Sequence, residues 1–252
     1  MEKNKIALIL WFSFLFTAPV SAQMMTEQEA DALFESLSNW GRWGENDQKG
    51  TVNFITSETR VSAARLVQTG TSVSMAHEVL DEPAADNFSP YDHRMTSIGS
   101  SPGPWSGDFI GVSYHGYAHS HLDALCHRFQ FGTMYNGYSE DEVTEAGCGQ
   151  LAITAFKEGI FGRGIVMDFP RLRGVDWLEN GTPITSDWLE EWEVANNIKI
   201  GSGDIVLIRT GRWMRRATLG PWNLAADSAG LHASSVSWFK DREVALIGSD
   251  SA

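Results

Sequence analysis

Two short apolar runs in the second half of the chain most constrain the fold. They occupy residues 205–208 and 244–247 and contain only Ile, Val, Leu and Ala. Strands without polar alternation are typical of a sheet that is covered on both faces, as parallel sheets are. Helical patterns at residues 186–196 and 233–240 alternate with these runs, and a further strand is expected at residues 164–169. This alternation of strands and helices predicts an α/β fold.

The N-terminus has the composition of a secretory signal peptide. Lys3 and Lys5 precede a nearly unbroken apolar run at residues 6–18, and the small residue Ala22 suits a signal peptidase. The run is too short to span a bilayer comfortably, although an uncleaved anchor is the alternative. We therefore expect removal of the signal peptide, residues 1–22, and export to the periplasm or the medium, without membrane contact after cleavage.

The net charge indicates which classes of partner to expect, and the two cysteines raise the question of a disulfide. The formal net charge is −13 at pH 7, which repels phosphate backbones and anionic lipids, so we expect a small-molecule substrate and no nucleic acid. Without a repeat, a low-complexity tract or a linker, residues 23–252 are expected to form a single domain. Cys126 and Cys148 could form a disulfide in an exported protein, but we expect buried, inert side chains, which are more common.

The first half of the chain has a less regular pattern. Helices are expected at residues 27–38 and 57–68, and a strand at residues 71–77, where apolar and polar residues alternate. Residues 81–108 are rich in Pro, Ser, Gly and Asp. Because loops of this length are commonly lids or binding loops, we expect this segment to be a lid.

Four of the seven histidines lie within residues 114–127. Residues 109–114 favour a strand, and if that strand continues, His119, His121 and Asp123 project from one face. Two imidazoles and a carboxylate, with positions left open for water, form a usual catalytic metal site. We therefore expect these three residues to bind one divalent metal ion, Zn²⁺ or Mn²⁺; surface or core histidines without a metal are the alternative.

A metal site of this kind needs a residue that transfers protons. His127 follows the metal segment and is expected to take this catalytic role. Its neighbour Cys126 has no signature of a nucleophile. The isolated histidines are expected to be structural, with His232 as the main exception; they are His77, His93 and His232.

Four further residues are candidates for contact with a substrate. His115 belongs to the histidine cluster, and Trp43 lies in a glycine-punctuated loop of the kind that often faces a ligand, so both are expected to bind substrate. With ten tryptophans in the chain, packing is the alternative for Trp43. Arg209 and Arg212 follow an apolar strand and could place a guanidinium in the site or form surface ion pairs.

The histidine cluster resembles the cyclase superfamily that includes bacterial kynurenine formamidase and isatin hydrolase. The superfamily signature is His-x-Gly-Thr-His-x-Asp-x-Pro-x-His. Residues 121–127 match its second half, with Leu125 in place of the proline, and Ser120 replaces the threonine. The resemblance extends over most of the chain and is greatest with a longer-chain branch.

The resemblance implies a mixed β-sheet core flanked by helices, of the swivelling β/β/α type. It also implies a zinc or manganese ion at His121 and Asp123, proton transfer by His127, and a homo-oligomer. The first histidine of the signature falls on Tyr117, so another residue must supply that ligand, and we expect His119 rather than His115.

A second departure lies at the C-terminus. Members of this superfamily continue past the strand equivalent to residues 244–247 with a segment that supplies another histidine and a glutamate, whereas this sequence ends at Ala252. The resemblance therefore implies either a shortened chain or a single-metal site with fewer ligands.

Together these features predict a metal-dependent hydrolase that cleaves an amide C–N bond of a small aromatic substrate with a metal-activated water. One alternative is a lactonase or dehydratase on the same site. The other is an exported protein that binds a metal or ligand without catalysis.

Overall fold

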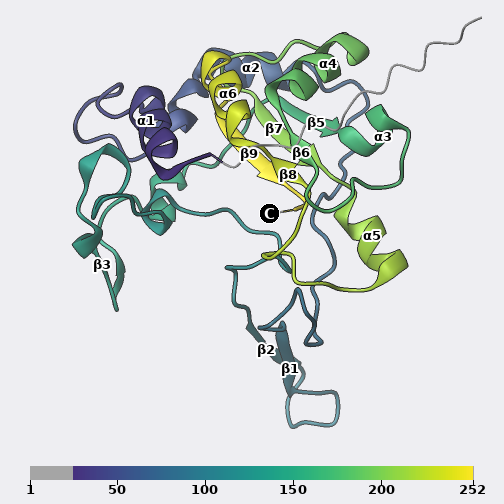
Figure 1. The fold of residues 1–252 in the computed structure, drawn as a ribbon. Helices are drawn as coiled ribbons and strands as arrows, with labels where there is room; N and C mark the ends of the chain where they lie inside the picture. The colour runs from purple at the N-terminus through teal and green to yellow at the C-terminus, as the bar shows by residue number, and fades with distance from the viewer. Residues whose placement is uncertain (1–24, 252) are drawn as a thin grey trace, which may run out of the picture.

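The computed structural model describes residues 25–251 (Figure 1). The predicted signal peptide, residues 1–22, lies outside the described residues. Within the described range, no helix combines the length and the apolar character needed to cross a membrane.

A parallel three-stranded sheet lies at the centre of the fold, in the strand order β5–β7–β9 (Figure 1). Its strands are β5 (Gly164–Asp168), β7 (Ile205–Arg209) and β9 (Leu246–Ser249). All three were predicted, β7 and β9 from the two apolar runs, but β9 begins later than expected. The α/β class predicted from the sequence is confirmed.

Helices connect and flank these strands, and most begin or end at local signals. The helices of the second half are α3 (Phe169–Arg173), α4 (Ser186–Asn196), α5 (Arg212–Leu219) and α6 (Val236–Asp241). The expected bounds of α4 are confirmed. It ends where Asn197 adopts a left-handed conformation, which asparagine tolerates better than most residues.

Only one face of the parallel sheet is fully covered. Ile165 and Met167 of β5 point to this face, where they pack with residues of α4 and α6 in the main hydrophobic core. On the opposite face, Val166 is 43% exposed and Leu207 is half-buried. The expectation of two covered faces is therefore wrong for the described residues, and the open face of the sheet lines a cavity that is described below.

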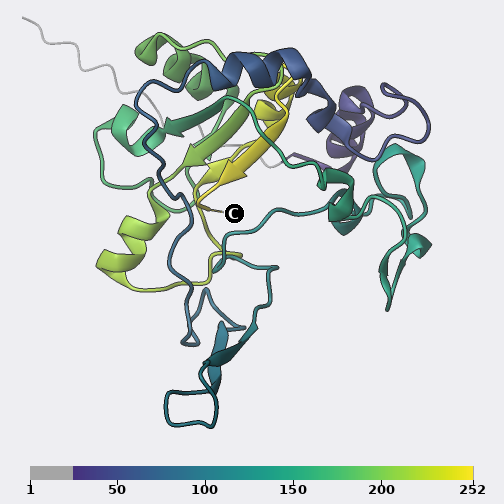
Figure 2. The same cartoon turned by 180° about the vertical axis from the view of Figure 1, so that it is seen from behind.

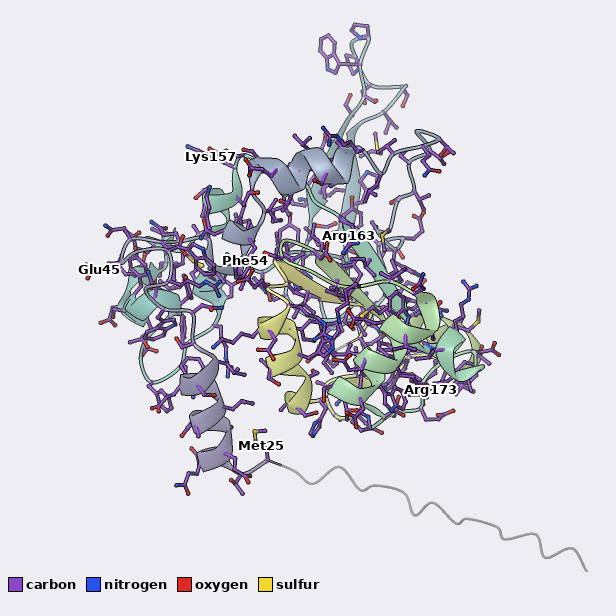
Figure 3. All side chains as sticks on the ribbon, turned by 90° about the horizontal axis from the view of Figure 1, so that it is seen from above. Met25, Glu45, Phe54, Lys157, Arg163 and Arg173 are labelled. Carbon is purple, nitrogen blue, oxygen red and sulfur yellow. A yellow bond between two sulfur atoms is a disulfide. The ribbon has the colours of Figure 1, made fainter. Side chains whose placement is uncertain are left out.

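The N-terminal half packs beside the sheet. Helix α1 (Glu27–Leu37) begins at a capping box, in which the Thr26 hydroxyl accepts from the Glu29 amide at 3.3 Å and the Glu29 carboxylate accepts from the Thr26 amide at 2.8 Å. Helix α2 (Ser57–Ala64) is shorter than expected. Between them in the sequence lies Phe54, which is labelled in Figure 3. It packs with Ala245, the residue before β9, and so joins this half to the sheet.

Residues 71–77 do not form the expected strand. The alternation of Val73 and Met75 with polar residues is present, but no strand of residues 25–251 pairs with this segment, and Val73 is 80% exposed. An alternating pattern creates two faces, whereas a strand also needs a partner for its backbone hydrogen bonds.

The expected lid at residues 81–108 contains most of a projecting hairpin. Strands β1 (Asp92–Ser97) and β2 (Gly107–Gly111) pair antiparallel and extend away from the parallel sheet (Figures 1 and 2). The hairpin does not lie over the sheet, so this arrangement does not support a lid.

The remaining elements are short. The two-residue strands are β3 (Val143–Thr144), β4 (Gly147–Cys148), β6 (Pro183–Ile184) and β8 (Gly230–Leu231). The 3-10 helices are η1 (Gly50–Phe54), η2 (Leu125–His127), η3 (Tyr135–Gly137), η4 (Glu140–Glu142), η5 (Ile153–Phe156) and η6 (Ala233–Ser235). Of these, η2 ends the segment that carries the histidine cluster.

Candidate metal centre

The histidine cluster lies on an irregular loop. Strand β2 ends at Gly111, and residues 112–124 contain bends and no strand, so the expected continuous strand is wrong. At Gly116 the backbone φ is +137°, a conformation that residues with a Cβ rarely adopt. The chain turns there, and the alternation of faces along a strand no longer applies.

The loop directs three imidazoles at one carboxylate oxygen. Oδ1 of Asp123 lies 3.0 Å from Nδ1 of His115, 3.5 Å from Nε2 of His121 and 3.5 Å from Nδ1 of His127. Predicted site residues His121, Asp123 and His127 are thus brought together, and His115 joins them. The turn around Gly116 makes this possible because it returns His115 towards Asp123.

The donor set fits a divalent metal ion. Ligand atoms of His115, Asp123 and His127 all lie within 4.8 Å of one another. Nε2 of His121 lies 3.5 Å from the same Asp123 oxygen, so the loop offers one imidazole more than the two that the expected site uses. Metal–ligand bonds of about 2.1 Å place neighbouring ligands of a tetrahedral ion about 3.4 Å apart. The separations of 3.0–3.5 Å around Asp123 are of this size.

The tautomer of His121 also suits metal binding. Its Nδ1 lies 2.8 Å from the carbonyl oxygen of His119. Because a carbonyl can only accept, Nδ1 must carry the proton, which leaves the lone pair of Nε2 free on the side of Asp123. A backbone carbonyl that orients a ligating histidine in this way is a common feature of metal sites.

His119 does not join this group. Its side chain is buried, with 9% exposure, and both ring nitrogens lack a hydrogen-bond partner among the described residues. The expected arrangement of His119 beside His121 and Asp123 is therefore not observed, because the loop bends instead of extending.

His121 lines two of the cavities that border the histidine loop. The larger has a volume of about 560 Å³ and lies between the open face of the sheet, the start of α5 and the loop; both His119 and His121 line it. The other, of about 490 Å³, is lined by His121 and Asp123 and reaches α6. His121 therefore stands between the larger cavity and the carboxylate.

Comparisons with known proteins agree with this architecture. Residues 86–252 match the model of a family described as "Putative cyclase". The chain belongs to the cyclase family. A crystal structure of a novel cyclase is 31% identical, with a TM-score of 0.75, and the alignment covers 85% of this chain and 75% of that one. No curated protein matches the chain.

Membership of the cyclase family confirms the resemblance found in the sequence and indicates an enzyme. The match to a solved cyclase also supports the fold class, because the alignment extends over most of both chains. The roles of the individual site residues remain predictions.

In this family member, Trp43 lies apart from the histidine loop. It packs edge to face against Phe54, with ring centroids 5.0 Å apart. It lines neither of the two cavities that His121 lines. This position favours packing, the alternative that the sequence left open, and does not support substrate binding.

A buried ion-pair network holds the histidine loop against α5. Arg212 donates to Asp86 at 3.0 Å and to the carbonyl of Tyr117, and Arg216 donates to Asp86 at 2.8 Å. Burial alone would raise the pKa of Asp86, but hydrogen bonds from Arg216 and Arg212 hold it below its usual value. Arg212 is therefore a buried residue of the cavity wall and does not form a surface ion pair. Arg209 instead forms an ion pair with Asp168, at 2.8 Å.

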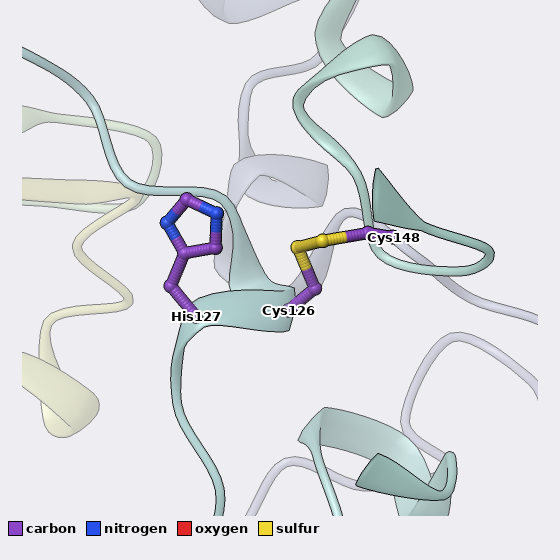
Figure 4. Close-up of side chains that lie close together, drawn as sticks. All are labelled: Cys126, His127 and Cys148. Atoms are coloured by element: carbon purple, nitrogen blue, oxygen red, sulfur yellow. A yellow bond between two sulfur atoms is a disulfide. The ribbon is translucent and has the colours of Figure 1, made fainter. Parts of the chain in front are cut away.

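A disulfide anchors the end of the loop beside His127. Cys126 and Cys148 are joined, with their Cα atoms 6.3 Å apart, so the expectation of two unpaired cysteines is wrong (Figure 4). The short β3–β4 hairpin brings Cys148 next to η2, a proximity that the sequence separation of 22 did not reveal. Since no thiol remains, these cysteines offer no metal ligand.

Removal of the disulfide is expected to destabilise the protein. In the Cys126→Ala/Cys148→Ala double variant, the free energy of unfolding should fall by about 3 kcal/mol, because a closed loop of this length restricts the unfolded chain. Urea unfolding with and without dithiothreitol measures the effect. Reductant should lower the midpoint of the wild-type protein and leave that of the double variant unchanged; equal midpoints for both proteins under oxidising conditions would contradict the prediction.

Proposed function

We propose that this protein is a metal-dependent hydrolase that cleaves an amide C–N bond of a small aromatic substrate. The observation that carries the proposal is the convergence of three imidazoles on Oδ1 of Asp123, at distances of 3.0–3.5 Å. This group adjoins a cavity of about 560 Å³, which is of the size that small-molecule sites usually have.

In this proposal, His115, His121 and Asp123 hold one zinc or manganese ion. His115 takes the place expected for His119, because its Nδ1 lies 3.0 Å from the Asp123 carboxylate, whereas neither ring nitrogen of His119 has a hydrogen-bond partner among residues 25–251. Imidazole nitrogen and carboxylate oxygen suit both metals. When bound, the ion supplies Lewis acidity, which lowers the pKa of water and polarises a carbonyl group.

His127 is the proton-transfer residue of the proposal. Its Nδ1 faces Asp123 at 3.5 Å, which leaves Nε2 free to accept a proton from water and to return it to the leaving nitrogen. The disulfide at Cys126 restrains the backbone next to this imidazole. The side chain is 37% exposed, so solvent can exchange protons with it.

Export and self-association are part of the same proposal. The Cys126–Cys148 disulfide supports a periplasmic or secreted location, since such bonds persist in oxidising compartments. The β1–β2 hairpin supports a homo-oligomer, because an isolated two-stranded hairpin is marginally stable in water and this one exposes Ile110 and Trp105. Sedimentation of the purified protein would test the second point.

Replacement of His127 separates catalysis from metal binding. With zinc or manganese added, His127→Ala is expected to retain the metal content of the wild-type protein but to hydrolyse formanilide about 100-fold to 10,000-fold more slowly, the usual contribution of a general acid–base group. His93→Ala is a matched control, since the exposed imidazole of His93 lies on the β1–β2 hairpin and pairs with Asp108 at 3.1 Å.

A panel of four test substrates distinguishes between the candidate activities. It should contain formanilide, a lactam, an aryl ester and a lactone, each assayed with metal and with chelator. Cleavage of the lactone alone would overturn the assignment of an amide bond. A protein that binds one equivalent of metal and cleaves none of the four compounds would overturn the hydrolase proposal.

A further inference from the structure

The larger cavity has an apolar floor made by the open face of the parallel sheet. Val166, Leu207 and Gly248 form this floor, in register on the three neighbouring strands. A Cβ at Gly248 would lie 2.7 Å from a methyl carbon of Leu207, so the glycine keeps the floor flat there. The carboxyl ends of parallel strands are a common location for ligands in α/β proteins.

One wall of the cavity is made of stacked rings. The rings of His77 and Trp213 are 3.8 Å apart between centroids and inclined by 14°, and both residues line the cavity. The Arg212 guanidinium lies 4.3 Å from the centroid of the Trp213 ring. A flat apolar floor and a rigid aromatic wall suit a planar ring better than a flexible chain.

Both ring nitrogens of His119, which lines this cavity, are unsatisfied. Its ring nitrogens are both buried, and neither has a hydrogen-bond partner within residues 25–251. A buried polar atom without a partner costs roughly 1–3 kcal/mol, and folded proteins rarely keep one without a reason. His119 lines the cavity, so a bound ligand can supply the missing partner once the ring turns to expose a nitrogen that is buried in the ligand-free protein.

We propose that His119 binds the ligand and not the metal: its ring N–H donates to a carbonyl oxygen of a planar ring compound that lies on the floor of the cavity. His121 lines the same cavity, so a ligand held in this way lies beside the proposed metal ligand. The inference rests on the proposed function only in identifying this ligand with the substrate.

Two probes of the same shape test the inference without any turnover. Acetophenone is a planar ring compound with a carbonyl oxygen and no C–N bond, and α-methylstyrene replaces that oxygen with carbon. Binding of both is measured by saturation-transfer NMR to the wild-type protein and to His119→Leu, His119→Gln and His93→Leu. His93 is an exposed histidine on the hairpin, paired with Asp108, and serves as the control.

The expected result is selective for the carbonyl probe. His119→Leu should weaken acetophenone binding by about 3-fold to 10-fold, the usual contribution of one hydrogen bond, and change α-methylstyrene binding by less than about 2-fold. His119→Gln, which keeps an N–H donor, should restore part of the affinity for acetophenone. His93→Leu should leave the binding of both probes unchanged. All variants should keep the metal content of the wild-type protein.

Stability provides an independent measurement. Because leucine removes two unsatisfied nitrogens, the ligand-free His119→Leu protein is expected to be as stable as the wild-type protein or more stable. Three results for His119→Leu would each overturn the inference: an equal loss of affinity for both probes, unchanged acetophenone binding, or loss of the metal. Neither probe can be hydrolysed, so failure of the proposed activity would not alter this test.

Discussion

Replacement of Asp123 by alanine is expected to abolish metal binding and hydrolysis together. Asp123 is the one carboxylate of the group, and the three imidazoles converge on its Oδ1 at 3.0–3.5 Å. Substitution of residues that only orient metal ligands already costs about 10-fold to 100-fold in affinity, so loss of this direct ligand should cost at least about 100-fold. Metal analysis after dialysis, with the hydrolysis rate of formanilide, measures both effects.

Asp108 offers a matched control for this experiment. It also lies beside an imidazole, with Oδ2 3.1 Å from Nε2 of His93, and its side chain is 51% exposed, close to the 57% of Asp123. Asp108→Ala should keep both the metal and the activity. Full metal content in Asp123→Ala would exclude the proposed centre, whatever the activity of that variant.

Replacement of Asp86 by alanine is expected to have the largest effect on stability. The Asp86 side chain is fully buried and accepts hydrogen bonds from Arg212, whose side chain is 4% exposed, and from Arg216. Without the carboxylate, a buried guanidinium is left uncompensated, which typically costs about 3–5 kcal/mol. Urea unfolding should show a loss of this size.

An exposed ion pair provides the comparison. Arg173 and Glu191 lie 2.7 Å apart, but the Glu191 side chain is 49% exposed. Glu191→Ala should therefore cost less than about 1 kcal/mol. A similar small loss in Asp86→Ala would show that the buried network contributes little to stability.

The same network predicts a dependence of stability on pH. The pKa of Asp86 is lower in the folded protein than its usual value, because of its hydrogen bonds with Arg216 and Arg212. Its contribution is therefore complete above the unfolded pKa of about 3.9 and is lost as the pH falls through the lower folded value. Acidification below about pH 4 should destabilise the wild-type protein more steeply than Asp86→Ala.

Local signals in the sequence predicted several elements correctly. Thr26 and Glu29 marked the start of α1, and the apolar spacing marked both ends of α4. The run at residues 205–208 predicted β7, and the motif at residues 121–127 predicted the family. Each of these features depends on residues within a few positions of one another, so the chain itself carries the necessary information.

Other expectations failed where distant segments must meet. The strand expected at residues 71–77 has no partner among the described strands, and the sheet has one open face because the packing helices cover only the other. The disulfide depends on the β3–β4 hairpin that carries Cys148 to Cys126. Local periodicity contains no information on these contacts.

The sequence by itself determined the α/β class, the family, and the imidazole and carboxylate groups of the candidate metal centre. Each of these is a property of a short segment of the chain. Only the tertiary structure decided which histidines meet Asp123. The turn at Gly116 brings His115 to the carboxylate and leaves His119 in the cavity over the sheet. The physical reason is that the direction of a side chain on a loop depends on backbone conformation and on distant packing, such as the contact of Arg212 with the Tyr117 carbonyl.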